Sequence, residues 1–268
     1  MKYVILSIAA LAAVFGLSFL IAGLVRRRLT RKPPVAVHIL IAAGAGILVL
    51  GGAAAVFLNI HYPAQDIKAF AHQSGVTVTD TDGGYFINGS GTDKALIFYP
   101  GAMVDADAYL PLMTRIAESG TDCFLPEMPA RMAIFDANAA DKIRTRYDYD
   151  TWILAGHSMG GMIAAKYAAT HKGIDGVVLL AAYPIDKLSD TTALLSVYGT
   201  DDTVLERDAY ESAKADFPAR TTEVVIAGGN HAQFGNYGAQ SGDGEAHITR
   251  EEQQRQTVEA IKAFANIL

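Results

Sequence analysis

The chain has 268 residues, of which 51% are hydrophobic and 19% charged, a length that accommodates one enzyme-sized domain with extra segments but not two. The first 60 residues hold no acidic residue, so residues 61–268 carry all 28 acidic and 16 of the 22 basic groups, a net charge of −12. An acidic domain of this kind repels nucleic acid, which is therefore excluded as an expected partner. The single cysteine, Cys123, cannot form an internal disulfide, and no cysteine and histidine spacing predicts a metal site.

Two long apolar runs fill the first 60 residues and predict a membrane anchor. Residues 4–25 carry no charge, and a helix of that length spans about 33 Å, enough for the hydrocarbon core of a bilayer. Residues 35–59 are rich in glycine and alanine, which let two helices pack closely in lipid. A cleaved signal peptide is the alternative, but the first run is too long for one and a second run follows it. We therefore expect two transmembrane helices, 4–25 and 35–59, with the lipid bilayer as a partner.

The charges around these runs predict their orientation. Five basic residues lie between the runs, at positions 26–28, 31 and 32, whereas only Lys2 precedes the first run. Short basic loops stay in the cytoplasm. We expect a multi-pass protein of the cell membrane whose domain after residue 60 lies outside the cytoplasm.

Residues 61–268 form a second domain, in which short apolar segments alternate with helical patterns. A hairpin with an Asp/Gly turn at 80–84 opens this domain. The alternation predicts an α/β domain, a mostly parallel sheet with helices on both faces. We expect strands at 76–79, 85–88, 95–99, 123–125, 151–155, 176–182, 194–199 and 222–226, and helices at 108–119, 133–146, 159–169, 206–215 and 251–267.

The sequence Gly-His-Ser-Met-Gly at 156–160 follows an apolar strand and opens an alanine-rich helix. This strand–turn–helix context is what a nucleophilic serine in a G-x-S-x-G motif requires. A sharp, strained turn presents Ser158 at the end of the strand, near the positive N-terminus of the helix, where a developing oxyanion is stabilised. We therefore expect Ser158 to be the nucleophile.

A serine nucleophile needs a general base, and the base needs an orienting carboxylate. In α/β domains with a G-x-S-x-G motif, these residues occur along the chain in the order Ser, Asp or Glu, His. His231 lies in a loop directly after the strand at 222–226 and is the expected base. The other two histidines after Ser158 fit less well. His171 ends the helix after the nucleophile, and His247 lies in a polar loop.

The orienting acid is expected in the loop after the strand at 194–199. Asp201 and Asp202 both lie there within reach of His231, and the spacing from the preceding glycine favours Asp202. The carboxylate that is not used would be solvated or would cap a helix. Glu206 is a more remote candidate.

Two backbone N–H groups are expected to bind the oxyanion. One belongs to Met159, directly after the nucleophile. The other comes from the loop after the strand at 95–99, where Ala102 is the first choice and Met103 the next. The Met103 side chain is also a candidate substrate contact, although core packing explains it equally well. This chemistry requires no metal and no organic cofactor.

These segments together resemble the α/β-hydrolase superfamily from about residue 94 to 268. The residues that carry the resemblance are Phe-Tyr-Pro-Gly at 98–101, Gly-His-Ser-Met-Gly-Gly at 156–161, Gly-Thr-Asp-Asp at 199–202 and Gly-Asn-His-Ala-Gln-Phe-Gly-Asn-Tyr-Gly at 229–238. The chain is most similar to the small, lidless bacterial branch near the dienelactone-hydrolase-like proteins. The resemblance implies an α/β-hydrolase fold, a Ser–Asp–His triad and hydrolysis of acyl esters.

Three features of this sequence bear on that resemblance. Pro100 and Gly101 stand where many relatives have His-Gly. About a dozen residues separate the strands at 176–182 and 194–199, which is too few for a lid, so the site is expected to be open. Dienelactone hydrolases use a cysteine nucleophile, whereas this chain has Ser158, so that specific activity is not expected.

The sequence therefore predicts a membrane-anchored serine hydrolase that cleaves carboxylic esters or thioesters of small acyl substrates. Two alternatives stay open. One is a catalytically silent binding or scaffold domain held at the membrane. The other is an acyltransferase or peptidase of the same fold, because a fold alone does not determine the reaction.

Overall fold

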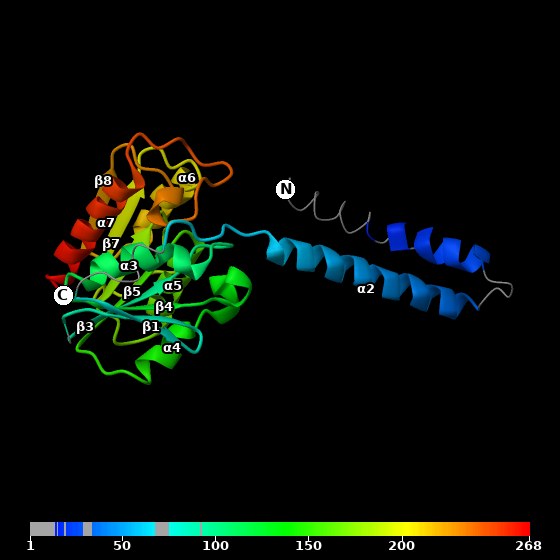
Figure 1. Cartoon of the computed structure of the whole chain (residues 1–268), viewed down its shortest axis with the longest axis horizontal. Helices are drawn as coiled ribbons and strands as arrows, with labels where there is room; N and C mark the ends of the chain where they lie inside the picture. Colours follow the sequence, from blue (N-terminus) through cyan, green and yellow to red (C-terminus); the bar gives the residue numbers. More distant parts are fainter. Residues whose placement is uncertain (1–13, 15, 19, 29–33, 68–74, 92) are drawn as a thin grey trace. The chain divides into compact units, whose positions relative to one another are not determined.

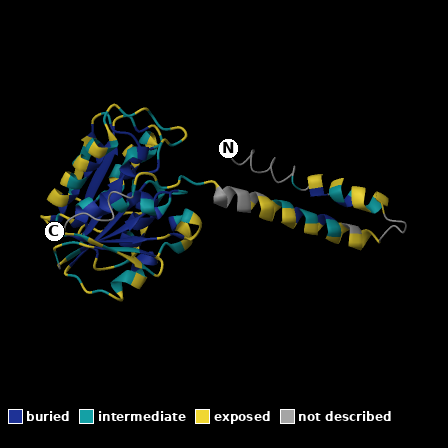
Figure 2. Ribbon diagram, viewed as in Figure 1, coloured by how far each residue is buried: buried dark blue, intermediate teal, exposed yellow. Residues whose placement is uncertain are grey.

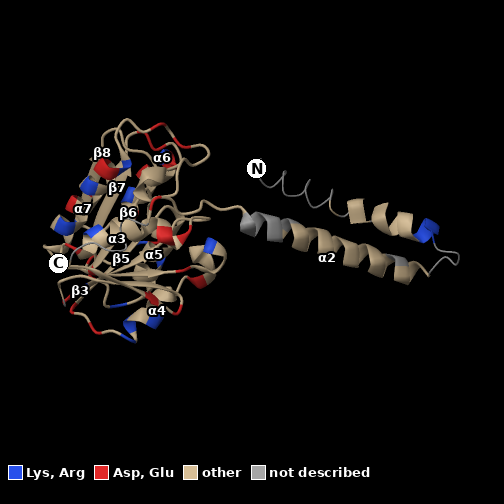
Figure 3. Ribbon diagram, viewed as in Figure 1, with Lys and Arg blue, Asp and Glu red and all other residues tan. Residues whose placement is uncertain are grey.

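The computed structural model describes residues 14, 16–18, 20–28, 34–67, 75–91 and 93–268, and the chain divides into two units, Met1–Ile60 and His61–Leu268. In the first unit, α2 (Val35–Asn59) is a 25-residue helix whose sequence has no Lys, Arg, Asp or Glu, and its described residues are tan in Figure 3. Its segment Val35–Gly52 has a mean hydropathy of 2.2, and within the described residues α2 is the one helix long and apolar enough to cross a membrane.

The first expected span, 4–25, lies largely outside the described residues. Its described part is helical at 16–18 and 20–25, and this helix continues to residue 28. Two membrane-spanning helices therefore stay a prediction.

The second unit contains one eight-stranded sheet in the order β1-β2-β4-β3-β5-β6-β7-β8 (Figure 1). Strand β2 runs antiparallel to both of its neighbours, and the pairs from β4 through to β8 are all parallel. The expected strands are thus all present, with ends that differ by at most two residues. The strands are β1 (Thr77–Thr81), β2 (Gly84–Asn88), β3 (Lys94–Tyr99), β4 (Asp122–Pro126), β5 (Thr151–His157), β6 (Gly176–Leu180), β7 (Ala193–Gly199) and β8 (Thr221–Ile226).

Helices cover both faces of the sheet, as the sequence predicts. The α-helices are α3 (Leu110–Ala117), α4 (Ala139–Arg144), α5 (Met159–Thr170), α6 (Arg207–Ala213) and α7 (Arg250–Ala265). Short 3-10 turns are η1 (Ala106–Tyr109), η2 (Pro129–Arg131), η3 (Ala133–Asp136), η4 (Lys214–Asp216) and η5 (Ala232–Phe234).

The central strands are buried on both faces, which explains why they are apolar throughout (Figure 2). Successive side chains point to opposite faces, so Leu96 and Phe98 of β3 pack in one core with α3 and α7. Ile97 and Tyr99 of the same strand pack in the other core with α4 and α5.

The prediction of one continuous helix over 133–146 is wrong, because the structure divides this segment into η3 and α4. The Tyr99 hydroxyl causes the break. It donates to the carbonyl of Ala137 at 3.0 Å and accepts the N–H of Ala140 at 3.0 Å. The polar groups that a continuous helix would pair internally are therefore bonded to a side chain from the sheet.

Residues 181–192, between β6 and β7, contain no helix or strand. This connection is too short to hold a lid. The expectation of a fold without a large lid is therefore confirmed, and the carboxyl ends of β5 and β6 are not covered by an inserted domain.

Candidate active site

Ser158 occupies the sharp turn between β5 and α5. Its backbone has φ 53° and ψ −128°, a conformation that costs a non-glycine residue free energy and is found mostly at functional sites. The Ser158 N–H donates to the carbonyl of Leu180 at the end of β6, at 2.9 Å. This bond and the start of α5 hold the serine at the carboxyl edge of the sheet.

Asp202 and His231 meet in the interior, although 29 positions separate them along the chain. The His231 Nδ1 lies 2.9 Å from Asp202 Oδ2, and both side chains are at most 1% exposed. The other carboxylate oxygen of Asp202 accepts the N–H groups of Val204 and Leu205, at 3.0 and 2.8 Å. Since an ionised carboxylate only accepts, His231 Nδ1 carries the proton and Nε2 is left with a free lone pair.

The loop that carries His231 is fixed by polar side chains. The two carboxylate oxygens of Asp243 accept the N–H groups of His231 and Ala232, at 3.2 and 2.8 Å. The fully buried Gln253 of α7 accepts the N–H of Asn230 at 3.0 Å and donates to its carbonyl at 2.7 Å. Both sides of His231 are thus anchored, which limits the positions its ring can take.

The structure shows no hydrogen bond between Ser158 and this pair. His231 Nε2 is buried and has no hydrogen-bond partner among the described residues, and the Ser158 hydroxyl forms no hydrogen bond there either. The ring centroid of His157, the residue before the nucleophile, lies 4.5 Å from that of His231. Serine–histidine bonds of this kind often form only when substrate binds.

The backbone donors of the candidate oxyanion hole differ in whether they are already bonded. Gly101 N–H donates to the Tyr109 hydroxyl at 3.1 Å, and Met103 N–H donates to the carbonyl of Arg131 at 2.9 Å. No acceptor among the described residues pairs with Ala102 N–H. Met159 is the first residue of α5, whose N–H has no acceptor within the helix. Of the loop donors weighed from the sequence, Ala102 is therefore free and Met103 is not.

His157 and Tyr109 form a buried network that the sequence analysis missed. The Tyr109 hydroxyl lies 2.8 Å from His157 Nδ1, and both side chains are almost fully buried. Because this hydroxyl already accepts the Gly101 N–H, its own proton is free to go to His157 Nδ1. Burial, and then the neighbouring His231, lower the pKa of His157, so its ring is neutral and suited to accept. Burial raises the pKa of Tyr109, which keeps its proton.

This network ties the nucleophile turn to the loop after β3. A Cβ on Gly101 would lie 2.8 Å from His157 Nδ1 and 2.9 Å from the Tyr109 hydroxyl, so only glycine allows this approach. In the sequence, the one indication of this network is the histidine inside the motif at 156–160. Nothing in the sequence indicated that Tyr109 would be its partner.

Asp201, the other candidate acid, pairs with a different histidine. Its Oδ2 lies 2.7 Å from His247 Nδ1, and the His247 side chain is 78% exposed. The two neighbouring aspartates thus form two separate Asp–His pairs, a buried one with His231 and a surface one with His247. The hydrogen bond and charge of Asp201, with a contribution from Glu245, raise the pKa of His247.

Other reactive groups do not gather elsewhere in the described part of the chain. The Cys123 thiol is buried in β4, and burial raises its pKa well above the usual value, so it is a poor nucleophile. Within the described residues, no group of three histidine, cysteine, aspartate or glutamate side chains could hold a metal ion.

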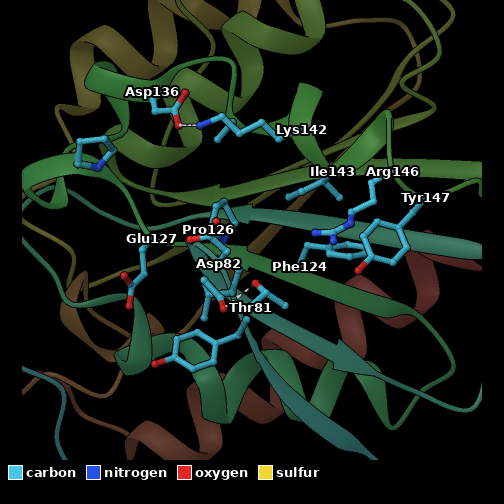
Figure 4. Close-up of a pocket in the computed structure, with 16 residues that line it drawn as sticks. Thr81, Asp82, Phe124, Pro126, Glu127, Asp136, Lys142, Ile143, Arg146 and Tyr147 are labelled. Carbon is cyan, nitrogen blue, oxygen red and sulfur yellow. Dashed lines mark hydrogen bonds and ion pairs between the residues drawn. The ribbon is translucent and has the colours of Figure 1, made fainter.

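Two hollows lie near the carboxyl end of β4. One, of about 410 Å³, is lined by Pro100 and Val104 of the oxyanion loop and by Asp105, Met128 and Arg131. The other, of about 260 Å³, lies between the β1–β2 turn and α4, where Figure 4 shows Lys142 bonded to Asp136. Neither hollow is lined by Ser158 or His231, so the first borders the candidate site through its loop and the second is separate from it.

Comparisons with known proteins agree with this architecture. The sequence model of the alpha/beta hydrolase family matches residues 95–255. No curated protein matches the sequence.

Three solved structures share the fold of the chain at low sequence identity. A soluble variant of monoglyceride lipase from Saccharomyces cerevisiae has a TM-score of 0.51 at 12% identity, with 70% of this chain and 93% of that chain covered. A bacterial membrane phospholipase A has a TM-score of 0.51 at 16% identity, with 87% of this chain and 97% of that chain covered. A Klebsiella pneumoniae protein assigned as a dienelactone hydrolase has a TM-score of 0.50 at 15% identity, covering 67% and 91%.

Replacing Tyr109 by Phe tests the buried network. The change leaves His157 Nδ1 and Gly101 N–H without partners, which we expect to destabilise the fold by about 1–3 kcal/mol. Thermal unfolding of the full-length chain in detergent measures the loss. Tyr62→Phe is a matched control at a half-buried tyrosine whose hydroxyl accepts one exposed N–H. Equal stability of Tyr109→Phe and the control would contradict a structural role for the Tyr109–His157 bond.

The surface pair predicts a pH dependence for His247. A pKa raised above the ordinary 6.5 means that the pair stabilises the folded protein below that pH and that this stabilisation is lost as pH rises through the raised pKa. Asp201→Asn should return the midpoint to about 6.5, whereas Asp202→Asn should leave it raised. An NMR titration of the His247 ring, assigned with His247→Gln, measures this, and an unchanged midpoint in Asp201→Asn would rule the pair out.

Proposed function

Because the chain belongs to the alpha/beta hydrolase family, we propose that it is a membrane-anchored serine hydrolase that cleaves carboxylic esters or thioesters. The observation that carries the proposal is the buried Asp202–His231 pair, whose free Nε2 lies in the neighbourhood of the Ser158 turn. This order and geometry match a nucleophile, a base and an orienting acid.

In this mechanism the Ser158 oxygen attacks the acyl carbon while His231 Nε2 takes the serine proton. The tetrahedral intermediate collapses, the bond from the acyl carbon to the leaving group breaks, and His231 returns the proton to the departing alcohol or thiol. A water molecule then attacks the acyl-enzyme by the same proton route and releases the acid. Asp202 holds the ring and stabilises its cation.

Two free N–H groups support stabilisation of the oxyanion. Those of Ala102 and Met159 are the donors that the surrounding structure leaves available, and each such donor contributes about 3 kcal/mol to transition-state stabilisation in enzymes of this kind. The half-buried Met103 side chain, in the same loop, is the proposed contact for a small acyl group. The mechanism needs no metal or organic cofactor.

The membrane part of the proposal rests on α2. Its 25 residues, all apolar except His38 and Asn59, exceed the length needed to cross the hydrocarbon core. The proposal includes a second membrane span at 4–25. The basic segment between this span and α2 lies in the cytoplasm, so the hydrolase domain lies outside the cytoplasm.

This orientation predicts that protease added to intact cells or spheroplasts cleaves the domain after residue 60. Detection with a C-terminal tag measures the cleavage, and lysed cells are the control. A domain that resists protease until the cells are lysed would reverse the orientation.

A catalytically silent domain is the second candidate, and one observation favours it. The Ser158 hydroxyl and His231 Nε2 are not hydrogen-bonded to each other. Activation of the serine is therefore the property that separates the two functions.

We expect a fluorophosphonate probe to label the full-length chain in detergent and Ser158→Ala to remain unlabelled. Asp202→Asn should lower kcat/KM on p-nitrophenyl butyrate by about a thousandfold or more, because the ring loses its orienting carboxylate. Asp201→Asn is the matched control and should stay within about twofold, since its partner is a surface histidine.

The outcomes separate the two candidates. A folded wild-type chain that neither reacts with the probe nor cleaves an ester would favour the silent domain. Equal losses in Asp201→Asn and Asp202→Asn would remove Asp202 from its proposed role.

A further inference from the structure

The segment that follows α2 enters the hydrolase domain next to the oxyanion loop. Tyr62 N–H donates to the carbonyl of Met103 at 2.7 Å, and Asp105 N–H donates to the carbonyl of Tyr62 at 3.1 Å. These bonds pair Tyr62 with Val104 as an isolated parallel bridge. Only two residues separate Asn59, the last residue of α2, from Tyr62, so their Cα atoms are at most about 11 Å apart. The covalent connection from α2 to the residue that pairs with the oxyanion loop is therefore three peptide bonds long.

Exposed apolar side chains gather on this same edge of the sheet. Among the described residues of His61–Leu268, five large apolar side chains are exposed. Ile134 and Phe135, which are 56% and 61% exposed, lie in η3 after β4, and Ile185, 44% exposed, lies in the loop after β6. The remaining two, Val225 and Ile267, lie in β8 and after α7.

The sheet order places these side chains around the candidate site. Strands β3 and β5, which carry the oxyanion loop and Ser158, lie between β4 and β6. With neighbouring strands about 4.8 Å apart, β4 and β6 are separated by about 14 Å. The η3 turn and the loop after β6 thus follow the two strands that flank the strands carrying the candidate site.

The η2 turn, which shortly precedes η3, is joined to the oxyanion loop. Arg131, three residues before Ile134, accepts the Met103 N–H with its carbonyl and pairs its guanidinium with Asp105. Ala130 and Arg131 both have left-handed backbones, with φ of 51° and 58°. Such conformations in non-glycine residues persist where surrounding contacts hold them, so η2 is in a fixed position relative to the loop.

We propose that the mouth of the Ser158 site faces the bilayer that anchors α2, and that its substrate is a lipid ester residing in that bilayer. Ile134, Phe135 and Ile185 enter the interfacial region, and the acyl ester reaches Ser158 from the membrane rather than from solution. Apolar side chains left in water on a tethered domain are stabilised by transfer into lipid. The net charge of −12 disfavours an anionic lipid surface, so the substrate is an uncharged or zwitterionic ester. This inference rests on the proposed esterase function and names its substrate class.

The first experiment compares two esters with one enzyme preparation. The full-length chain is reconstituted in phosphatidylcholine vesicles and given either soluble p-nitrophenyl butyrate or a fluorogenic phosphatidylcholine that is resident in the same vesicles. The double variant Ile134→Ser with Phe135→Ser should lose about tenfold in rate on the vesicle-resident ester, since two apolar side chains no longer enter the interface. Its rate on the soluble ester should stay within about twofold of wild type. The control, Ile267→Ser, changes an exposed apolar residue at the opposite edge of the sheet and should retain both rates.

The second experiment reads the orientation without activity. Trp152 is the single tryptophan of the chain and is 7% exposed. A tryptophan introduced by Phe135→Trp should be quenched by spin-labelled phosphatidylcholine in the vesicles. One introduced by Ile267→Trp should not, because the Ile267 carbonyl accepts from Arg220 just before β8, at the opposite edge of the sheet.

The outcomes distinguish the inference from the function on which it rests. Equal quenching of the two tryptophan variants, or an equal change in both esterase rates of the Ile134 and Phe135 double variant, would overturn the bilayer-facing site. A wild-type chain inactive on both esters and unreactive to fluorophosphonate would overturn the esterase function instead, and with it the lipid substrate, while the quenching still determines which face meets the membrane.

Discussion

The close approach of the start of α5 to the end of β3 is the constraint on which the candidate site depends. A Cβ on Gly160 would lie 2.1 Å from the carbonyl oxygen of Tyr99 and 2.2 Å from that of Pro100, so no other residue permits this contact. The register pairs Tyr99 with Gly156, which brings the start of the oxyanion loop beside the nucleophile turn. The strained backbone of Ser158 follows, because the chain must leave β5 and begin α5 within one residue.

Around this contact, the site consists of buried polar groups whose partners are nearly all present. Asp202 accepts three hydrogen bonds, and the His231 loop is fixed by Asp243 and Gln253. A buried polar group without a partner costs about 1–3 kcal/mol, so a network of this kind favours one arrangement over its alternatives. Among the groups left unbonded in the described part of the site are His231 Nε2 and the N–H groups of Ala102 and Met159, which a reacting ester would use. His157 Nε2 is also buried without a hydrogen-bond partner, and the proposed mechanism does not use it.

The sequence predicts the strands and the order of the functional segments because those signals are local. Apolar runs, turn residues and the G-x-S-x-G pattern each lie within a few positions. It could not predict the break between η3 and α4, which depends on the Tyr99 hydroxyl from a distant strand, nor the contact of Tyr109 with His157 across 48 positions. Sequence spacing also left both Asp201 and Asp202 as candidates for the orienting acid, since two adjacent residues are almost equally far along the chain from His231. Only the direction of each side chain separates them, one toward the interior and the other toward His247.

The loop after β3 has two roles that bear on each other. It carries the free N–H of Ala102, and it receives the segment that leads from α2 through the backbone bonds of Tyr62. Met103, whose φ is 61°, lies between these two functions, with its carbonyl bonded to Tyr62 and its N–H to Arg131. A backbone held on both sides in a left-handed conformation has little freedom to move, which fixes the direction of the neighbouring Ala102 N–H. The segment at Tyr62 is thus part of what pre-organises the candidate oxyanion hole, and Met103 links the two physically.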